Sequence, residues 1–173
     1  MNTQTIARLS ILTAAALILG YVERFIPLPM AMPGIKLGLA NTVLLYGVYM
    51  MRRNNTLTLM VLKVLLSGLL FAGFSGVLYG FAGGLLSLGA MLLVHRTSDL
   101  SVVGVSILGA VFHNIGQVLM AMLVVQTRGL LLYLPVLMVS GIVTGLITGL
   151  IARNVLKGLR FHHTVTPSKK LAN

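Results

Sequence analysis

The sequence predicts an all-α membrane protein, a polytopic bundle of six transmembrane helices. The mean hydropathy of the 173-residue chain is +1.00, and hydrophobic residues make up 57% of it. Charged residues make up only 9%, which is too few for the surface of a soluble domain of this length. The apolar residues form continuous runs and do not alternate with polar ones, which argues against a β-barrel.

Six stretches have the length of a membrane span, which is about 20 mostly apolar residues. We expect the domain 1–152 to hold these six helices and residues 153–173 to form a basic, frayed cytoplasmic tail at the membrane surface. The first run is followed by further spans and ends in no small-residue cleavage site, so we interpret it as a helix and not as a signal peptide. The expected helices are Ile6–Phe25, Ile35–Met51, Thr56–Ala72, Gly76–Val94, Leu100–Gln126 and Leu130–Ala152.

Positive charge orients this bundle. The formal net charge is +11, from 13 Lys and Arg against 2 Asp and Glu. With the amino terminus inside, the inner segments hold nine of these cations and the outer loops hold three, which are Arg24, Lys36 and Arg128. Because Lys and Arg accumulate on the cytoplasmic side, we expect both termini in the cytoplasm and a multi-pass protein of the cell inner (cytoplasmic) membrane. The charge then needs no nucleic-acid partner.

The segment 33–41 lies between the first two apolar runs and opens with a helix breaker and a hinge, Pro33 and Gly34. It then carries a cation, Lys36, and an amide, Asn41, into the next apolar run. Two interpretations stay open. The two side chains help to hold a ligand at the helix mouth, or Lys36 only extends to the lipid headgroups.

A second polar group lies inside the fifth apolar run, where polar side chains are costly. His113, Asn114 and Gln117 form one stripe at helical spacing, together with Ser106. The stripe lies in the outer half of the helix, at the depth of a pocket beneath the outer loop. It either contacts a ligand or is a polar network that only holds helices together.

Two charged residues need partners. Lys63 lies within the third apolar run. Either its stem carries the ammonium back to the inner surface, or the ammonium stays inside the bundle and contacts a ligand. Glu23 is the only carboxylate near the outer mouth, and the simplest partner for it is Arg24, Lys36 or His113.

Small residues mark the expected packing faces. Glycines recur every four residues in the fourth and sixth runs, which lets helix backbones approach closely. We interpret both stripes as ordinary bundle packing. The first helix also has a smooth face of small residues, which packs internally or docks another membrane protein. The residues are Gly76, Gly80 and Gly84, then Gly141, Gly145 and Gly149, and on the first helix Ser10, Ala14, Ala15 and Ala16.

The acidic residues exclude several activities. Glu23 and Asp99 are the only two, whereas prenyl-diphosphate synthesis and phosphatase chemistry need clustered carboxylates to hold Mg²⁺. The chain has no cysteine and no phosphate-binding G-x-x-x-x-G-K-[ST] loop, and its histidines lack metal-ligand spacing. We therefore expect no enzyme activity, no metal and no cofactor.

Several segments together resemble the Gx transporter family, also labelled heptaprenyl diphosphate synthase component I. Lys63 stands where that family more often has Arg, which weakens any bidentate anion contact there. Tyr79 stands where a small residue is common. The matching segments are Pro33–Asn41 (PGIKLGLAN), Lys63–Gly68, Ala82–Leu88 (AGGLLSL) and Leu108–Gln117 (LGAVFHNIGQ).

The resembled family is similar to the S components of energy-coupling factor vitamin transporters. The resemblance implies six helices, cytoplasmic termini, a pocket open to the outside beneath the loop after the first helix, and a partner ATPase module docked on the small face of the first helix. The synthase label conflicts with the scarcity of acids, and we follow the acids.

Our leading hypothesis is a membrane subunit that binds or transports a small organic molecule. An anionic ligand is favoured, because Lys36, Arg24 and Arg128 surround the outer mouth. The alternative is a non-catalytic membrane subunit that supports isoprenoid-quinone or flavin-linked electron transfer, and an enzyme acting on a lipid-borne substrate has the least support. The expected ligand-binding residues are Lys36, Asn41, Lys63, His113, Asn114 and Gln117.

Overall fold

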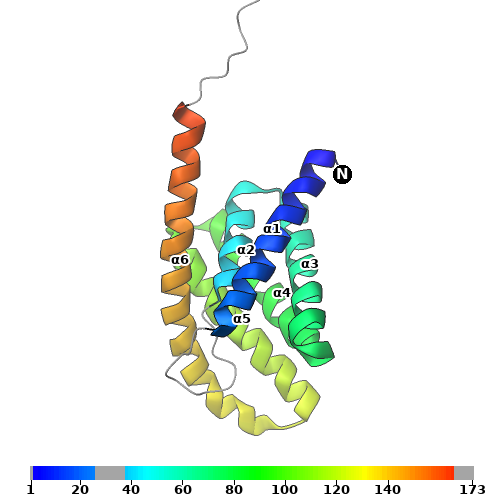
Figure 1. Cartoon of the computed structure of the whole chain (residues 1–173). Helices are drawn as coiled ribbons and strands as arrows, with labels where there is room; N and C mark the ends of the chain where they lie inside the picture. Colours follow the sequence, from blue (N-terminus) through cyan, green and yellow to red (C-terminus); the bar gives the residue numbers. More distant parts are fainter. Residues whose placement is uncertain (1, 26–37, 166–173) are drawn as a thin grey trace, which may run out of the picture.

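The computed structural model describes residues 2–25 and 38–165, and in this part of the chain short connections join helices, without strands. Six α-helices follow one another, with short 3-10 helices after the first and before the last (Figure 1). Their bounds are α1 Thr3–Val22, η1 Glu23–Phe25, α2 Leu39–Met50, α3 Arg53–Phe71, α4 Gly73–Thr97, α5 Val102–Val125, η2 Arg128–Tyr133 and α6 Leu134–Val165.

Five of the helices are long and apolar enough to cross a membrane, and α2 is not. Its 12 residues rise about 18 Å at 1.5 Å per residue, against a hydrocarbon core about 30 Å thick. The structure therefore corrects the expectation of six full spans to five long helices and a shorter one. The helix begins after Gly38. The φ of Gly38 is +73°, in the left-handed region that glycine adopts without steric cost. The expected start at Ile35 lies outside the described residues.

The last helix differs most from expectation. The prediction ended it at Ala152, where the apolar run stops, but α6 continues to Val165. The residues after Ala152 include good helix formers such as Arg153, Leu156 and Lys157, and the next proline is Pro167. Hydropathy marks where a helix stops being apolar, and it does not mark where a helix ends. α1 begins and α6 ends at the same end of the bundle (Figure 1).

Glycines allow the closest helix contacts, as expected. On α4, a Cβ at Gly80 would lie 3.0 Å from Val64 of α3. On α6, a Cβ at Gly145 would lie 2.6 Å from the Cα of Ile107 of α5. Both glycine stripes are therefore packing faces, which confirms their structural interpretation.

Two apolar clusters form the core. The larger one joins α2 through α6, and the smaller one joins α1 to α2 and α3. Large apolar side chains also remain exposed along the helices, as lipid-facing residues of a membrane bundle do. Examples more than 60% exposed are Ile11, Leu69, Phe74, Leu123 and Val139.

Candidate functional site

A charged cluster surrounds the start of α2. The α2 helix has no capping side chain of its own at Gly38. The carboxylate of Glu23, at the end of α1, takes this role: Oε1 accepts from the Gly38 N–H at 2.6 Å and Oε2 from the Leu39 N–H at 3.1 Å. A carboxylate at a helix N-terminus satisfies unpaired N–H groups and opposes the positive end of the helix dipole.

Asn41 and Lys63 meet at the same place. The Lys63 ammonium, from the middle of α3, donates to Oδ1 of Asn41 in the first turn of α2. Both residues are partly buried. The ammonium therefore turns toward the start of α2 and not toward the end of the bundle where α3 begins. This contradicts the interpretation in which the Lys63 stem carries the ammonium back to the inner surface. We call Glu23, Gly38, Leu39, Asn41 and Lys63 the α2-start cluster.

His113 and Gln117 share a contact on α4. A Cβ at Gly83 would lie 2.9 Å from Cγ of Gln117 and 3.0 Å from Cε1 of His113. The α5 helix approaches more closely still at Gly116, where a Cβ would lie 2.5 Å from the Ala82 carbonyl oxygen. The two side chains thus lie beside the tightest crossing of α4 and α5, one turn apart on the same face.

Asn114 points to a different neighbour. Its Nδ2 donates to the carbonyl oxygen of Leu137 in α6 at 2.6 Å, and the Ser140 hydroxyl donates to the same oxygen at 2.9 Å. Asn114 therefore holds α5 to α6, which favours the interhelical-network interpretation for this residue.

A buried hydroxyl pair joins the same two helices farther along. Ser106 and Thr148 lie 3.0 Å apart, and the Thr148 hydroxyl also lies 2.9 Å from the Thr144 carbonyl oxygen. Since a hydroxyl has one proton, Thr148 donates to that carbonyl and accepts from Ser106. The Thr148 methyl would lie 4.0 Å from a Cβ on Gly38, so this pair adjoins the α2-start cluster.

The predicted residues thus fall into three places. Asn41 and Lys63 are bonded to each other, His113 and Gln117 lie against α4, and Asn114 is bonded to α6. Lys36 lies outside the described residues. The role of Glu23 was missed, because its described partners are backbone N–H groups fifteen and sixteen residues onward. The available signal was a single acid following an apolar helix, ahead of a second helix that lacks a capping side chain.

Arg24, which the sequence placed at the outer mouth, contacts the end of α3. Its Nη2 donates to the carbonyl oxygen of Phe71, the last residue of α3, at 2.7 Å. Its guanidinium carbon lies 4.8 Å from the centre of the Phe71 ring. Arg24 therefore satisfies a carbonyl at the negative end of α3.

Among the described residues, no group of three or more His, Cys, Asp or Glu side chains lies close enough together to hold a metal ion. The α2-start cluster brings an ammonium, an amide and a carboxylate to one helix terminus.

No curated protein and no solved structure matches this chain. A family model does match, over residues 12–155, and its description is heptaprenyl diphosphate synthase component I. The match includes α2 through α5 and every described residue predicted for the site. The chain therefore belongs to the heptaprenyl diphosphate synthase component I family.

Proposed function

We propose that this protein is a membrane subunit that binds or transports a small organic molecule, in the manner of an energy-coupling factor S component. The observation that carries the proposal is the α2-start cluster. Placing a charged side chain at the centre of a membrane helix costs about 2.5–3.5 kcal/mol on insertion scales. Lys63 lies in the middle of α3, and a charge kept there is by default a functional candidate.

The chemistry of the cluster suggests the ligand. The Lys63 ammonium and the amide of Asn41 are suited to an anionic or strongly polar group. Glu23 supplies a negative charge at the same helix start. We expect the ligand to be a small molecule with an anionic group near Lys63. We expect His113 and Gln117 to contact the rest of that molecule.

We propose that the protein is not itself a catalyst. Two acidic residues in the whole chain cannot form the carboxylate cluster that diphosphate chemistry with Mg²⁺ uses. We further propose that the protein lies in the cell inner membrane with cytoplasmic termini, and that a partner ATPase module supplies energy for transport.

The family description favours a second candidate, because it names a component of a synthase. In this alternative the protein is a non-catalytic membrane subunit held to a partner protein, and supports isoprenoid-quinone or flavin-linked chemistry. It predicts a stable partner and no small ligand at the α2-start cluster.

Native mass spectrometry of the protein, gently purified from its own membranes, tests the two candidates. Wild type is compared with Lys63→Met, which removes the ammonium and keeps an unbranched side chain. Arg8→Met is the matched control, because Arg8 is an exposed cation on α1 away from the cluster. We expect a small-molecule adduct of one mass on wild type and on the control, and its loss from Lys63→Met.

An adduct that survives Lys63→Met unchanged would refute the assigned site. A bare chain that copurifies with another membrane subunit would support the second candidate. Thermal unfolding of all three proteins is measured in parallel, so that loss of the adduct is not confused with loss of the fold.

A further inference from the structure

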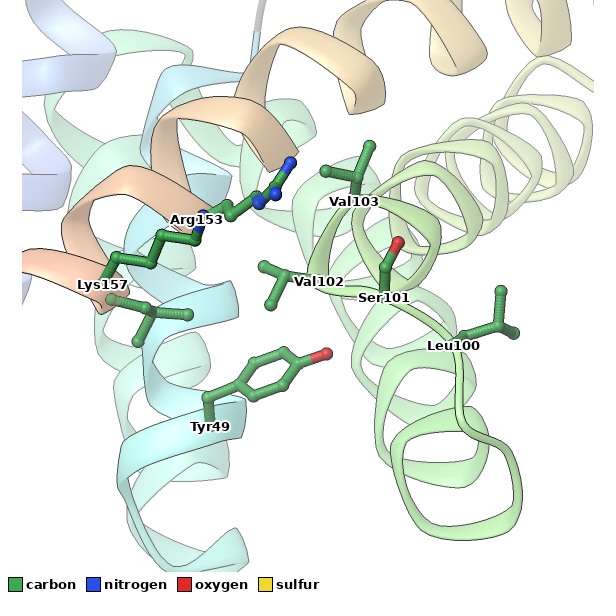
Figure 2. Close-up of a pocket in the computed structure, with 8 residues that line it drawn as sticks. Tyr49, Leu100, Ser101, Val102, Val103, Arg153 and Lys157 are labelled. Carbon is green, nitrogen blue, oxygen red and sulfur yellow. The ribbon is translucent and has the colours of Figure 1, made fainter. Parts of the chain in front are cut away.

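A cavity of about 480 Å³ lies at the other end of α2, between the end of that helix, the start of α5 and α6 (Figure 2). This volume is within the range of small-molecule pockets, about 300–1,000 Å³. We call it the basic-end cavity. Its lining residues are Tyr49, Leu100, Ser101, Val102, Val103, Arg153, Leu156 and Lys157.

The cavity has an apolar floor and a cationic rim. Leu156 is buried at 6% exposure, whereas Arg153 and Lys157, one turn apart on α6, are exposed. Figure 2 shows the Arg153 guanidinium extending from α6 toward Val103 of α5. No carboxylate is among the residues that line the cavity, so an anion that enters it meets two cations and no lining acid.

Tyr49 supplies an independent observation. Its hydroxyl oxygen is buried and finds no hydrogen-bond partner among the described residues. Such a group costs free energy unless a partner is present. Figure 2 shows this hydroxyl on the side of the cavity formed by Leu100 and Val102. The oxygen is closed to solvent in this structure, so a ligand oxygen that displaced its neighbours would be its first acceptor.

The ring of Tyr49 also borders a second cavity, of about 420 Å³. Three arginines line that cavity and again no carboxylate does, and the His95 ring lies 4.3 Å from the Tyr49 ring, centre to centre. Positive charge therefore surrounds Tyr49 from both sides. The three arginines are Arg52, Arg53 and Arg96.

We propose that the basic-end cavity binds a phosphate-bearing amphiphile, with its phosphate between Arg153, Lys157 and the Tyr49 hydroxyl and its apolar part on Leu156 and Val102. Two neighbouring cations suit a group with more than one negative charge, and the apolar floor suits a hydrocarbon chain. This site goes beyond the proposed function and does not depend on it. The source of the phosphate is a lipid headgroup or a soluble organic phosphate.

Binding to the purified full-length protein in neutral detergent at low salt tests the proposal. The probes are dihexanoyl phosphatidic acid, dihexanoyl phosphatidylcholine as the probe without net charge, and inorganic diphosphate as a competitor. We expect phosphatidic acid to bind more tightly than phosphatidylcholine and to be weakened by salt. Competition by diphosphate would assign a soluble phosphate compound as the source, and lack of competition a lipid headgroup.

Variants locate the binding. Arg153→Gln with Lys157→Gln should weaken phosphatidic acid binding by about 25-fold, roughly fivefold per cation. Arg8→Gln with Arg128→Gln removes the same charge outside both cavities and should leave binding unchanged. Tyr49→Phe keeps the ring and should weaken binding by about tenfold. Equal binding of the two lipids, or equal loss in both double variants, would overturn the proposal.

Discussion

Gly83→Ala tests the crossing of α4 and α5, beside which His113 and Gln117 lie. A Cβ at this position would lie 2.8 Å from the His113 carbonyl oxygen, 2.9 Å from Gln117 Cγ and 3.0 Å from His113 Cε1. The nearest obstacle is backbone, so the two helices must separate to admit a methyl group. Overpacking costs about 1–3 kcal/mol, and a backbone obstacle favours the upper part of that range.

The higher helix propensity of Ala offsets about 1 kcal/mol of this cost. The net loss in the free energy of unfolding should therefore be about 1–2 kcal/mol, which lowers Tm by about 2–8 °C for a chain of this size. The assay is thermal unfolding in one mild detergent, followed by circular dichroism at the helix band.

Gly89→Ala is the matched control, because Gly89 lies on the same helix and a Cβ there would have nothing within 4 Å of it. Gly89→Ala gains only the higher helix propensity of Ala, so its Tm should be unchanged or slightly higher than that of the wild type. If Gly83→Ala unfolds at the same temperature as Gly89→Ala, the close approach of α4 and α5 is refuted.

Three further substitutions test the polar contacts. Glu23→Gln should lower the free energy of unfolding by about 0.5–2 kcal/mol, because an amide offers one acceptor oxygen to the start of α2; Asp99→Asn, an exposed acid, should not. A double-mutant cycle of Ser106→Ala and Thr148→Val should give a coupling of about 0.6 kcal/mol, and a value of zero would show that the hydroxyl pair is not formed. Arg24→Gln should destabilise by less than about 1 kcal/mol and less still at high salt, since its bond to Phe71 is exposed.

The helices were predictable because a membrane imposes length and hydropathy on each span. The residues at which the helices start and end were less predictable. Hydropathy alone cannot show that α2 begins only after Gly38, since the carboxylate that caps this start belongs to Glu23, fifteen residues earlier in the chain. It also placed the end of the last helix at Ala152, although a basic helix is stable beyond the apolar run and continues to Val165.

The candidate site was predictable as a set of residues and not as a set of contacts. Polar side chains inside apolar runs identified Asn41, Lys63 and Asn114, because such residues are costly in lipid. Which of them meet depends on helix tilt and rotation, which glycines such as Gly83 determine through close packing. The sequence alone left the bond from Lys63 to Asn41 and that from Asn114 to Leu137 equally open.

The length of α6 has a mechanical consequence. Its 32 residues form a rod about 48 Å long at 1.5 Å per residue. Along this rod lie the Leu137 carbonyl that accepts from Asn114, Thr148 with its methyl group beside the start of α2, and Arg153 at the basic-end cavity. One continuous helix therefore makes all three contacts, and no loop separates the α5 contact at Leu137 from the basic-end cavity at Arg153.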